Sequence, residues 1–540
     1  MSDGYFLGVD VGSASVRAGL YSAQGERLSF ATRPISQFHA SNARVEQSSA
    51  EIWQQVCAVV REAVDSSGIS PDAIRSIGFD ATCSLVALDA EGNGLSVSPD
   101  SPASQDIIMW MDHRAHEETV RINATRDPAL CYVGGEVSIE MELPKLLWLQ
   151  RHHPETWNQA WRFFDLADFL VWKATGQDAA SLCTLTCKWN YLAHEAQFSE
   201  SLLREVGLET LLTKIPDTIL DVAECVGKLS PQAAQALGLP EEVVVASGMI
   251  DAHAGGVALT GSHPEGTLAL TGSHPEGTLA LISGTSNCHM LASQTEIHTP
   301  GVWGPYWSAM LPGYWLTEGG QSAAGALVDW TLREHGASAD LFAKAEAAQR
   351  HPVALLNDWV AALEQEEKYP TRNLHILADH HGNRSPRSRP DARGSVVGLT
   401  LETGERALAR LYLATLQAIA YGTRHIMDTL KHHGHTLSRI VICGGATHNR
   451  LWLREYADAT GCDIHLLAEE DAVTLGAAIC GAVASGAWAT LTDATREMVK
   501  AGDIITRRPE TAAFHRQKYE AYLMLWTQQQ ALNLLMQQEM

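Results

Sequence analysis

The N-terminal segment places the strongest constraint on the fold. It reads GVDVGSASVRAGLYSAQGE, with an apolar strand that runs into Asp10, a turn of small residues at positions 12–15 and a second strand. This pattern predicts a β-hairpin, because a strand-to-helix phosphate loop needs a Gly-Lys-Ser/Thr ending or a third glycine that opens a helix. A small-residue hairpin offers N–H groups to an anion, and an acidic side chain beside it can hold a magnesium ion. An ordinary turn between strands is the alternative interpretation of this segment alone.

Two later segments, SGTSN at 283–287 and CGGATHN at 443–449, also follow apolar strands. In the first, the hydroxyl groups of Thr285 and Ser286 and the local N–H groups can hold a transferring phosphate. In the second, the paired glycines let the backbone lie against a flat ring, with Asn449 as a polar contact. Each segment alone could be a tight turn. Together with the hairpin they predict a two-lobed, ATP-dependent phosphotransferase.

The length and the element pattern predict the fold class. A chain of 540 residues exceeds what one hydrophobic core usually supports, so we expect two domains. Strand-like runs alternate with helix-like stretches, which is typical of α/β lobes. We place the domains at 1–258 and 259–540. The clearest elements are strands at 5–11, 15–22, 76–81 and 84–89, and helices at 49–65 and 405–431.

Charge and cysteine content exclude several classes of partner. Lys and Arg number 39 against 63 Asp and Glu, and the net charge of −24 argues against binding to nucleic acid or an anionic membrane. There is no apolar run of roughly 20 residues and no secretory signal pattern, so we expect a cytoplasmic protein without a membrane partner. The ten cysteines form no CxxC pair, which argues against a zinc site or a disulfide framework.

Residues 260–270 and 271–281 carry the identical sequence TGSHPEGTLAL. A single perfect copy is not a solenoid repeat and indicates a local duplication or a cloning artefact. Because only the second copy leads directly into SGTSN, we expect it to form the strand and the first copy to form an exposed loop. The entropy of loop closure grows slowly with length, so a longer surface loop costs on the order of 1 kcal/mol.

Asp251 is the candidate general base. A buried strand, EEVVVASGMI, delivers it to the start of the small-residue helix DAHAGGVAL. Phosphoryl transfer to a hydroxyl needs a base within reach of the attacking oxygen, and a carboxylate in a cleft can serve. An N-capping aspartate is an equally weighted interpretation, and the two roles do not exclude each other.

Eight motifs in order carry a resemblance to the FGGY carbohydrate kinases, from about Tyr5 to Gly486. The resemblance implies an α/β fold of two ribonuclease-H-like domains, of the actin/hexokinase type, flanking a catalytic cleft that binds Mg²⁺, ATP and a small sugar or polyol. It also implies a homodimer. The motifs are GVDVGSASVRAGL, DATCSLV, MWMDHRA, GMIDAHAG, SGTSNCHM, EGGQSAAGALVDW, HGNRSP and GGATHNRLWLREYAD.

The same resemblance assigns roles to individual residues. Asp10 would bind Mg²⁺ and belong to the first phosphate motif, and Asp251 would be the general base. The remaining nucleotide contacts are Gly12, Ser13 and Arg17 in the first phosphate motif, Gly284, Thr285 and Ser286 in the second, and Gly444, Gly445 and Asn449 in the adenosine motif.

For the sugar site, the run TCSLV at 82–86 is similar to the stretch of sequence that marks the D-ribulokinase branch of this family. The resemblance gives a pentulose pocket made by the main chain of Ala81, Thr82 and Cys83, and by Lys188, Asp251 and Glu318. Asp112 either lines this pocket or stabilises the lobe. The stretch 379–393 resembles a substrate-domain loop or serves an oligomer contact.

The resulting prediction is ATP-dependent conversion of D-ribulose to D-ribulose 5-phosphate. L-ribulose, D-xylulose or a pentitol are alternative substrates for the same mechanism. From another class, the chain could be a catalytically disabled, actin-like nucleotide-binding protein. The retention of Asp10, Asp251 and Thr285 argues against that alternative.

Overall fold

The computed structural model describes residues 4–40, 43–261 and 276–537. Its contacts divide the chain into two compact units. The first contains residues 1–276, 290–317 and 467–501, and the second contains 277–289, 318–466 and 502–540. Each unit therefore takes segments from both halves of the sequence.

A seven-stranded sheet forms the centre of the first unit. The order is β14 (Cys225–Lys228), β15 (Val244–Ala246), β6 (Ile74–Ala81), β1 (Tyr5–Val11), β2 (Ser15–Ser22) and β3 (Arg27–Pro34), with β16 (Met249–Ile250) paired to β6. β1, β6, β15 and β16 run parallel, and β2, β3 and β14 are antiparallel to their neighbours. The hairpin predicted from the first motif is confirmed, with the expected bounds for both strands.

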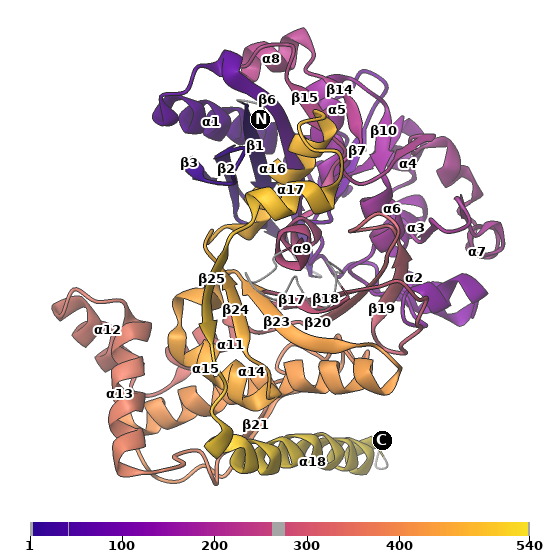
Figure 1. Cartoon of the computed structure of the whole chain (residues 1–540). Coiled ribbons are helices and arrows are strands. Elements are labelled where there is room, and N and C mark those ends of the chain that lie inside the picture. The colour runs from indigo at the N-terminus through magenta and orange to yellow at the C-terminus, as the bar shows by residue number, and fades with distance from the viewer. Residues whose placement is uncertain (1–3, 41–42, 262–275, 538–540) are drawn as a thin grey trace. The chain divides into compact units, whose positions relative to one another are not determined.

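Helices cover both faces of this sheet (Figure 1). α1 (Ser49–Ser67) packs along β2 and β3, and begins at Ser48, whose hydroxyl accepts a hydrogen bond from the Glu51 N–H. On the other face, α16 (Ala472–Ala484) packs against β1 and β6, and α9 (Asp251–Gly261) packs against α16. α16 comes so close that a Cβ at Gly8 would lie 1.8 Å from the Thr474 carbonyl oxygen. Glycine at this position is therefore required for the packing.

The rest of the first unit is a smaller sheet with mainly helical connections. The sheet order is β4 (Phe38–Ala40), β5 (Arg44–Gln47), β8 (Ile107–Ile108), β7 (Leu85–Leu88) and β9 (Arg162–Asp165). The helices are α2 (His116–Ala124), α3 (Glu142–His152), α4 (Pro154–Gln159), α5 (Leu166–Thr175), α6 (Leu182–Lys188), α7 (Glu200–Val206), α8 (Pro231–Leu237) and α17 (Leu491–Met498).

A second seven-stranded sheet contains most strands of the second unit. Its order is β19 (Trp303–Trp307), β20 (Trp315–Gln321), β18 (Asn287–Ser293), β17 (Gly277–Ser283), β23 (Leu437–Cys443), β24 (Ile464–Leu467) and β25 (Ala501–Ile505). β17, β23 and β24 run parallel, so the motifs that follow β17 and β23 lie at the same edge of the sheet.

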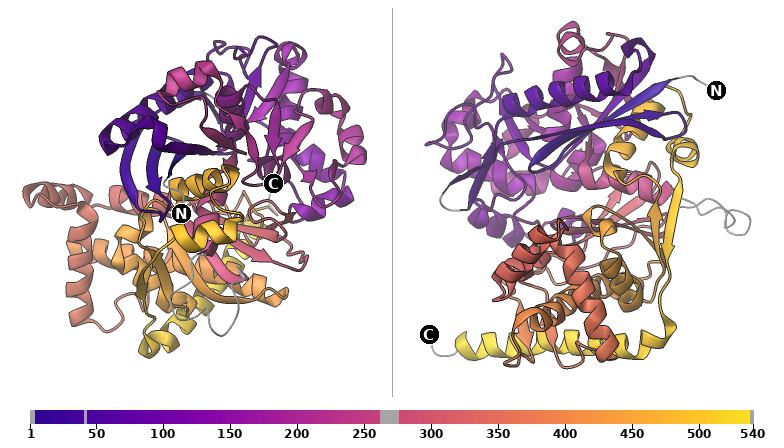
Figure 2. Two further views of the ribbon diagram at one scale, coloured as in Figure 1. Left: turned by 45° about the horizontal axis from the view of Figure 1, so that its top comes forward. Right: turned by 90° about the vertical axis from the view of Figure 1, so that its left-hand side faces the viewer.

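The second unit also contains several helices. The predicted long helix at 405–431 is confirmed as α14 (Gly404–His432), and α18 (Ala512–Gln537) packs against α15 (Arg450–Thr460) and β21 (His375–Leu377) (Figure 2). The others are α11 (Gly325–Glu334), α12 (Ser338–Ala347) and α13 (Pro352–Glu366). Among the described residues, no helix is long and apolar enough to cross a membrane.

The tandem repeat has the expected strand. The second copy supplies β17, whose residues from Thr278 to Ile282 pair with β23, so this prediction is confirmed. In the first copy, Thr260 and Gly261 end α9. The remainder of that copy, and with it the expected exposed loop, lies outside the described residues.

Candidate active site

The first glycine-marked segment is a tight and well-supported hairpin turn. The Gly12 N–H donates to the Ser15 carbonyl oxygen at 3.0 Å. Ser13 is held on both sides, since its hydroxyl accepts from Trp110 Nε1 at 2.9 Å and its carbonyl oxygen accepts from Gln47 Nε2 at 3.0 Å. The turn is therefore fixed in a shape that leaves Gly12 and Ser13 only partly covered.

Asp10 and Arg17 lie directly opposite each other in this hairpin. Their side chains form an ion pair, and Arg17 Nη1 also donates to Asp471 Oδ2 at 3.0 Å. Asp471 caps the N-terminus of α16 by accepting from the Thr474 N–H at 3.0 Å. Arg17 thus ties the hairpin to the start of the helix that packs beneath it.

A second buried carboxyl group, Asp80 on β6, is paired in register with Asp10. Burial raises the pKa of Asp10 to about 6, even though the charge of Arg17 opposes the shift. Burial and the charge of Asp10 raise the pKa of Asp80 well above its usual range. The environment therefore favours the protonated form of Asp80 beside Asp10.

Asp251 is the first residue of α9 and follows β16, whose Ile250 pairs with Ala81 at the end of β6. Its Oδ1 accepts from the Ala252 N–H at 2.7 Å. Burial raises its pKa, while that hydrogen bond and the charges of His253, Arg17 and Lys188 oppose the shift. Because β1, β6 and β16 are parallel, Asp10, Asp80 and Asp251 meet at one edge of the sheet.

All of the residues predicted for the sugar side except Glu318 belong to the first unit. Thr82, just past the end of β6, donates its N–H to the Val11 carbonyl oxygen at 2.9 Å. Lys188 is buried at the end of α6, and its charge lowers the pKa of both Cys83 and Asp251 against the dominant effect of burial. Its Nζ lies 4.4 Å from the ring centroid of Trp303. The lysine is thus beside the main-chain segment and the candidate base.

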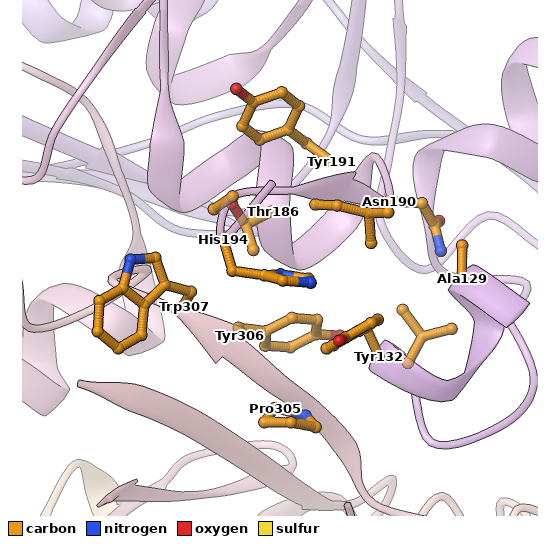
Figure 3. Close-up of a pocket in the computed structure, with 12 residues that line it drawn as sticks. Ala129, Tyr132, Thr186, Asn190, Tyr191, His194, Pro305, Tyr306 and Trp307 are labelled. Atoms are coloured by element: carbon orange, nitrogen blue, oxygen red, sulfur yellow. The ribbon is translucent and has the colours of Figure 1, made fainter. Parts of the chain in front are cut away.

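The opposite side of α6 packs on aromatic residues (Figure 3). Thr186 is two residues, or about 200°, from Lys188 around the helix, and it lines a pocket with Asn190, Tyr306 and Trp307. The pocket volume of about 10 Å³ accommodates about one water molecule, so it is not a sugar site. The side chains that line this pocket pack against α6 and so help to hold Lys188 in place.

Asp112 has a structural environment. Its carboxylate oxygens are buried, accept from the Val45 N–H at 2.7 Å and from the Arg114 N–H at 2.9 Å, and bind the Arg114 guanidinium at 2.8 Å. Arg114 also binds Glu46 at 2.8 Å. Of the two alternatives left open by the sequence, these contacts favour stabilisation of the lobe.

In the second unit, the SGTSN turn joins β17 to β18. The Thr285 carbonyl oxygen accepts from the N–H groups of Ala324 and Ala326 at 2.9 and 3.1 Å, at the start of α11. The Gly284 carbonyl oxygen accepts from the Gly325 N–H at 3.0 Å. The backbone is fixed from one side, and the Thr285 side chain remains exposed.

The adenosine motif lies beside this turn. Gly444 has a φ of +89°, and a Cβ there would lie 2.5 Å from the Ser283 carbonyl oxygen, so glycine is required. A Cβ at Gly445 would meet nothing within 4 Å. Asn449 is buried, and its amide donates to Tyr412 at 2.7 Å and accepts from Asn357 Nδ2 at 3.1 Å. These bonds show a structural use of the Asn449 side chain.

Glu318, the last predicted sugar contact, lies on β20 in the second unit and is buried.

Sequence reasoning missed Asp80 and Asp471 as neighbours of the site. A signal existed for Asp80, because it ends the apolar strand SIGFD in the same way that Asp10 ends FLGVD. No local pattern could have revealed the contact between Arg17 and Asp471, which are 454 residues apart.

Comparison with known proteins identifies the family. The models of the N-terminal and C-terminal domains of the FGGY family of carbohydrate kinases match residues 5–258 and 279–485. The chain is 42% identical over 530 residues to the human FGGY carbohydrate kinase domain-containing protein, covering 96% of each chain. It is 38% identical over 513 residues to a D-ribulokinase of Saccharomyces cerevisiae, covering 89% of this chain and 72% of that protein.

The crystal structure of xylulose kinase from Rhodospirillum rubrum superposes with a TM-score of 0.78 at 23% identity, covering 98% of this chain and 99% of that one. This likeness, with the family matches, confirms the expected α/β class and the two-domain, actin/hexokinase-type fold. The chain belongs to the FGGY family of carbohydrate kinases, and is a phosphotransferase that acts on the alcohol group of a small sugar.

Proposed function

We propose that this kinase transfers the γ-phosphoryl group of ATP to the terminal hydroxyl of D-ribulose, giving D-ribulose 5-phosphate. The observation that carries the proposal is the assembly of Asp251, Lys188 and the main chain at Ala81, Thr82 and Cys83 within one unit. The identity of 38% to a yeast D-ribulokinase supports the choice of sugar.

The chemistry assigned to Asp251 is general base catalysis. Its carboxylate accepts the proton of the sugar hydroxyl as that oxygen attacks the γ-phosphorus. The new P–O bond forms while the bond from the γ-phosphorus to the bridging oxygen breaks, and the electron pair leaves with ADP. A raised pKa makes Asp251 a stronger base than an exposed aspartate.

The residues around Asp10 fit a magnesium ion. The two oxygens of Asp80 are buried and accept no hydrogen bond from an N–H or hydroxyl group of the described residues, while Asp10 faces one guanidinium. No cluster of three or more ligands occurs in the described part of the chain. Mg²⁺ needs none, since it usually keeps several waters and takes one or two carboxylates plus substrate phosphates. Asp10 would hold the Mg²⁺ ion, and the bound ion would neutralise negative charge on the phosphates of ATP.

Gly12, Ser13 and Arg17 would bind phosphates of ATP, as would the turn of Gly284, Thr285 and Ser286. The open space above Gly445 suits the adenine ring, with Gly444 shaping the turn. Asn449 would act by supporting this turn through its bonds to Tyr412 and Asn357. Glu318 would accept a hydrogen bond from a sugar hydroxyl.

A coupled ADP-release assay tests the proposal. The purified protein is assayed with D-ribulose, L-ribulose, D-xylulose, ribitol and glycerol at equal concentrations. We expect D-ribulose to give the highest kcat/KM, with a product that is the 5-phosphate by ³¹P NMR. If another sugar gives a higher kcat/KM, that sugar and not D-ribulose is the preferred substrate. If none of the compounds is phosphorylated while ATP still binds, the result supports the alternative of a catalytically disabled nucleotide-binding protein. The homodimer and the cytoplasmic location stay predictions.

A further inference from the structure

The HGNRSP loop is anchored at the end of β20. The Ser385 N–H donates to the Gly320 carbonyl oxygen at 3.0 Å. Within the loop, Asn383 and Arg389 exchange backbone hydrogen bonds at 2.9 and 2.8 Å, and Asn383 Nδ2 donates to Asp379 Oδ1 at 2.9 Å. The loop therefore holds residue 384 in a fixed position next to the strand that carries Glu318.

The side chain of Arg384 lies across Gly320. A Cβ placed on Gly320 would be 2.5 Å from Arg384 Cδ and 2.9 Å from its Nη1. These distances are far below van der Waals contact, so only glycine lets the arginine occupy this place. Because Gly320 has no side chain, the guanidinium group of Arg384 fits against the strand at this position.

The strand pattern shows which face of β20 this guanidinium occupies. Gly319 faces Ile426 of α14, and Gln321 Nε2 donates to the Ile419 carbonyl oxygen of the same helix at 3.0 Å. Side chains alternate along a strand, so Glu318 and Gly320 point to the face away from α14. Arg384 thus lies on the face of β20 that carries Glu318, the candidate sugar contact.

The same end of β20 adjoins the second phosphate turn. Gln321 Oε1 accepts from Asn287 Nδ2 at 2.8 Å, and Asn287 directly follows Ser286. The charge of Arg384 also reaches β18, where it adds to the effect of burial in lowering the pKa of His289 to about 3. Neighbouring strands are about 4.8 Å apart, so an arginine side chain at Gly320 can span to the turn.

We propose that Arg384 is a catalytic residue that binds the transferring phosphoryl group together with the Gly284–Thr285–Ser286 turn. This inference rests on the kinase activity of the proposed function but not on D-ribulose as the sugar. Arg384 would also hold the phosphate of the sugar phosphate product before release.

The chemistry of the group fits this role. A guanidinium is permanently charged and donates two parallel hydrogen bonds to phosphate oxygens. In a chain with a net charge of −24, a fixed cation beside the phosphate turn offsets repulsion between the protein and the phosphoryl group. Negative charge on the equatorial oxygens of the transferring phosphoryl group must be stabilised in the transition state. The contact from Arg384 therefore acts mainly on kcat.

Three variants and a control test the proposal. Arg384→Gln removes the charge, Arg384→Lys keeps the charge without the paired donors, and Gly320→Ala displaces the side chain. Arg389→Gln is the control, because it removes an arginine from the same loop that pairs with Asp391 at the exposed surface. Each is assayed for kcat, for the KM of sugar, and for the Kd of D-ribulose 5-phosphate by isothermal titration calorimetry. Thermal unfolding is recorded for every variant.

For Arg384→Gln we expect kcat to fall by about 100-fold or more, with at least tenfold weaker binding of the sugar phosphate and little change in sugar KM. Arg384→Lys should be intermediate, Gly320→Ala should resemble Arg384→Gln, and Arg389→Gln should match the wild type. If the wild type prefers another sugar, that sugar and its phosphate replace the D-ribulose pair. Sugar phosphate binding within threefold of the wild type in Arg384→Gln and Arg384→Lys would overturn the proposal, whatever the wild-type turnover.

Discussion

Asp10 of β1 and Asp80 of β6 lie side by side in register on two parallel strands, and both side chains are buried. Two adjacent carboxyl groups in such a place cannot both be charged without a cation. Arg17 supplies one positive charge to Asp10, and the raised pKa of Asp80 favours its neutral form, which reduces the repulsion between the two groups. The charge of this buried pair therefore depends on the cation beside it.

The pH dependence of activity follows from the raised pKa values. Asp10 and Asp251 must both be unprotonated in the proposed mechanism, and both have a pKa above the usual carboxylate range, at about 6 for Asp10. We expect kcat/KM to be constant above neutral pH and to fall as the pH drops through about 6. A profile that stays flat to pH 5 would contradict this assignment.

Arg17→Gln should move the same acid limb to higher pH. The arginine lowers the pKa of Asp10, so its removal raises that pKa further and Asp10 is protonated earlier as the pH falls. Arg33→Gln is the matched control, since Arg33 pairs with Glu62 at the surface on a neighbouring strand. Measurement of kcat/KM from pH 5 to 9 for both variants checks the direction. A shift to lower pH in Arg17→Gln would be inconsistent with the ion pair.

Trp303→Leu should weaken sugar binding. The indole ring lies 4.4 Å from Lys188 Nζ, and a buried contact of this kind contributes about 2 kcal/mol. We expect the KM for sugar to rise by about ten- to thirtyfold, with the KM for ATP unchanged, because the ring orients the ammonium group. Trp330→Leu, at an exposed position on α11, is the control. An unchanged sugar KM in Trp303→Leu would remove the ring from this role.

Gly445→Ala should lower ATP affinity without affecting the fold. An added Cβ meets no protein atom within 4 Å, so it projects into the space assigned to adenine. We expect a KM for ATP at least tenfold higher and an unchanged unfolding midpoint. Gly336→Ala also adds a Cβ to open space and should change neither quantity. Equal ATP affinity in the two variants would place the nucleotide elsewhere.

Deletion of residues 260–270 should leave an active kinase. After the deletion Leu259 is followed by the identical Thr-Gly of the second copy, so α9 keeps the sequence of its last turn. β17 is unaffected because it consists of the end of the second copy and the two residues that follow it. Circular dichroism and the ADP-release assay check the outcome. Loss of folding would show that both copies are structurally needed.

Local signals in the sequence predicted the parts of the fold that depend on neighbouring residues. The hairpin followed from two apolar strands around a turn of small residues, and the helix predicted at 49–65 is α1, which extends to Ser67. The long helix predicted at 405–431 is α14. The family and the fold class were predicted from the order of the motifs, which is a property of the whole chain.

The side-chain environments could not be predicted because they depend on distant residues. Asp112 was left between two roles until the ion pairs of Arg114 with Asp112 and with Glu46 were visible. The adenosine contact of Asn449 stays a prediction, but the hydrogen bonds of its amide with Tyr412 and Asn357, on two other helices, could not be predicted. Arg384 stood in a motif without a role until Gly320 showed where its side chain lies.

The most direct test of the account is the activity of Asp251→Asn. The variant keeps the size of the side chain and its hydrogen bond to the Ala252 N–H but cannot take a proton. We expect turnover of D-ribulose to fall by at least a thousandfold, with ATP affinity within a few fold of the wild type by calorimetry. Asp65→Asn, at an exposed position on α1, should be fully active. A fully active Asp251→Asn would contradict the assignment of Asp251 as the base, and with it the proposed mechanism.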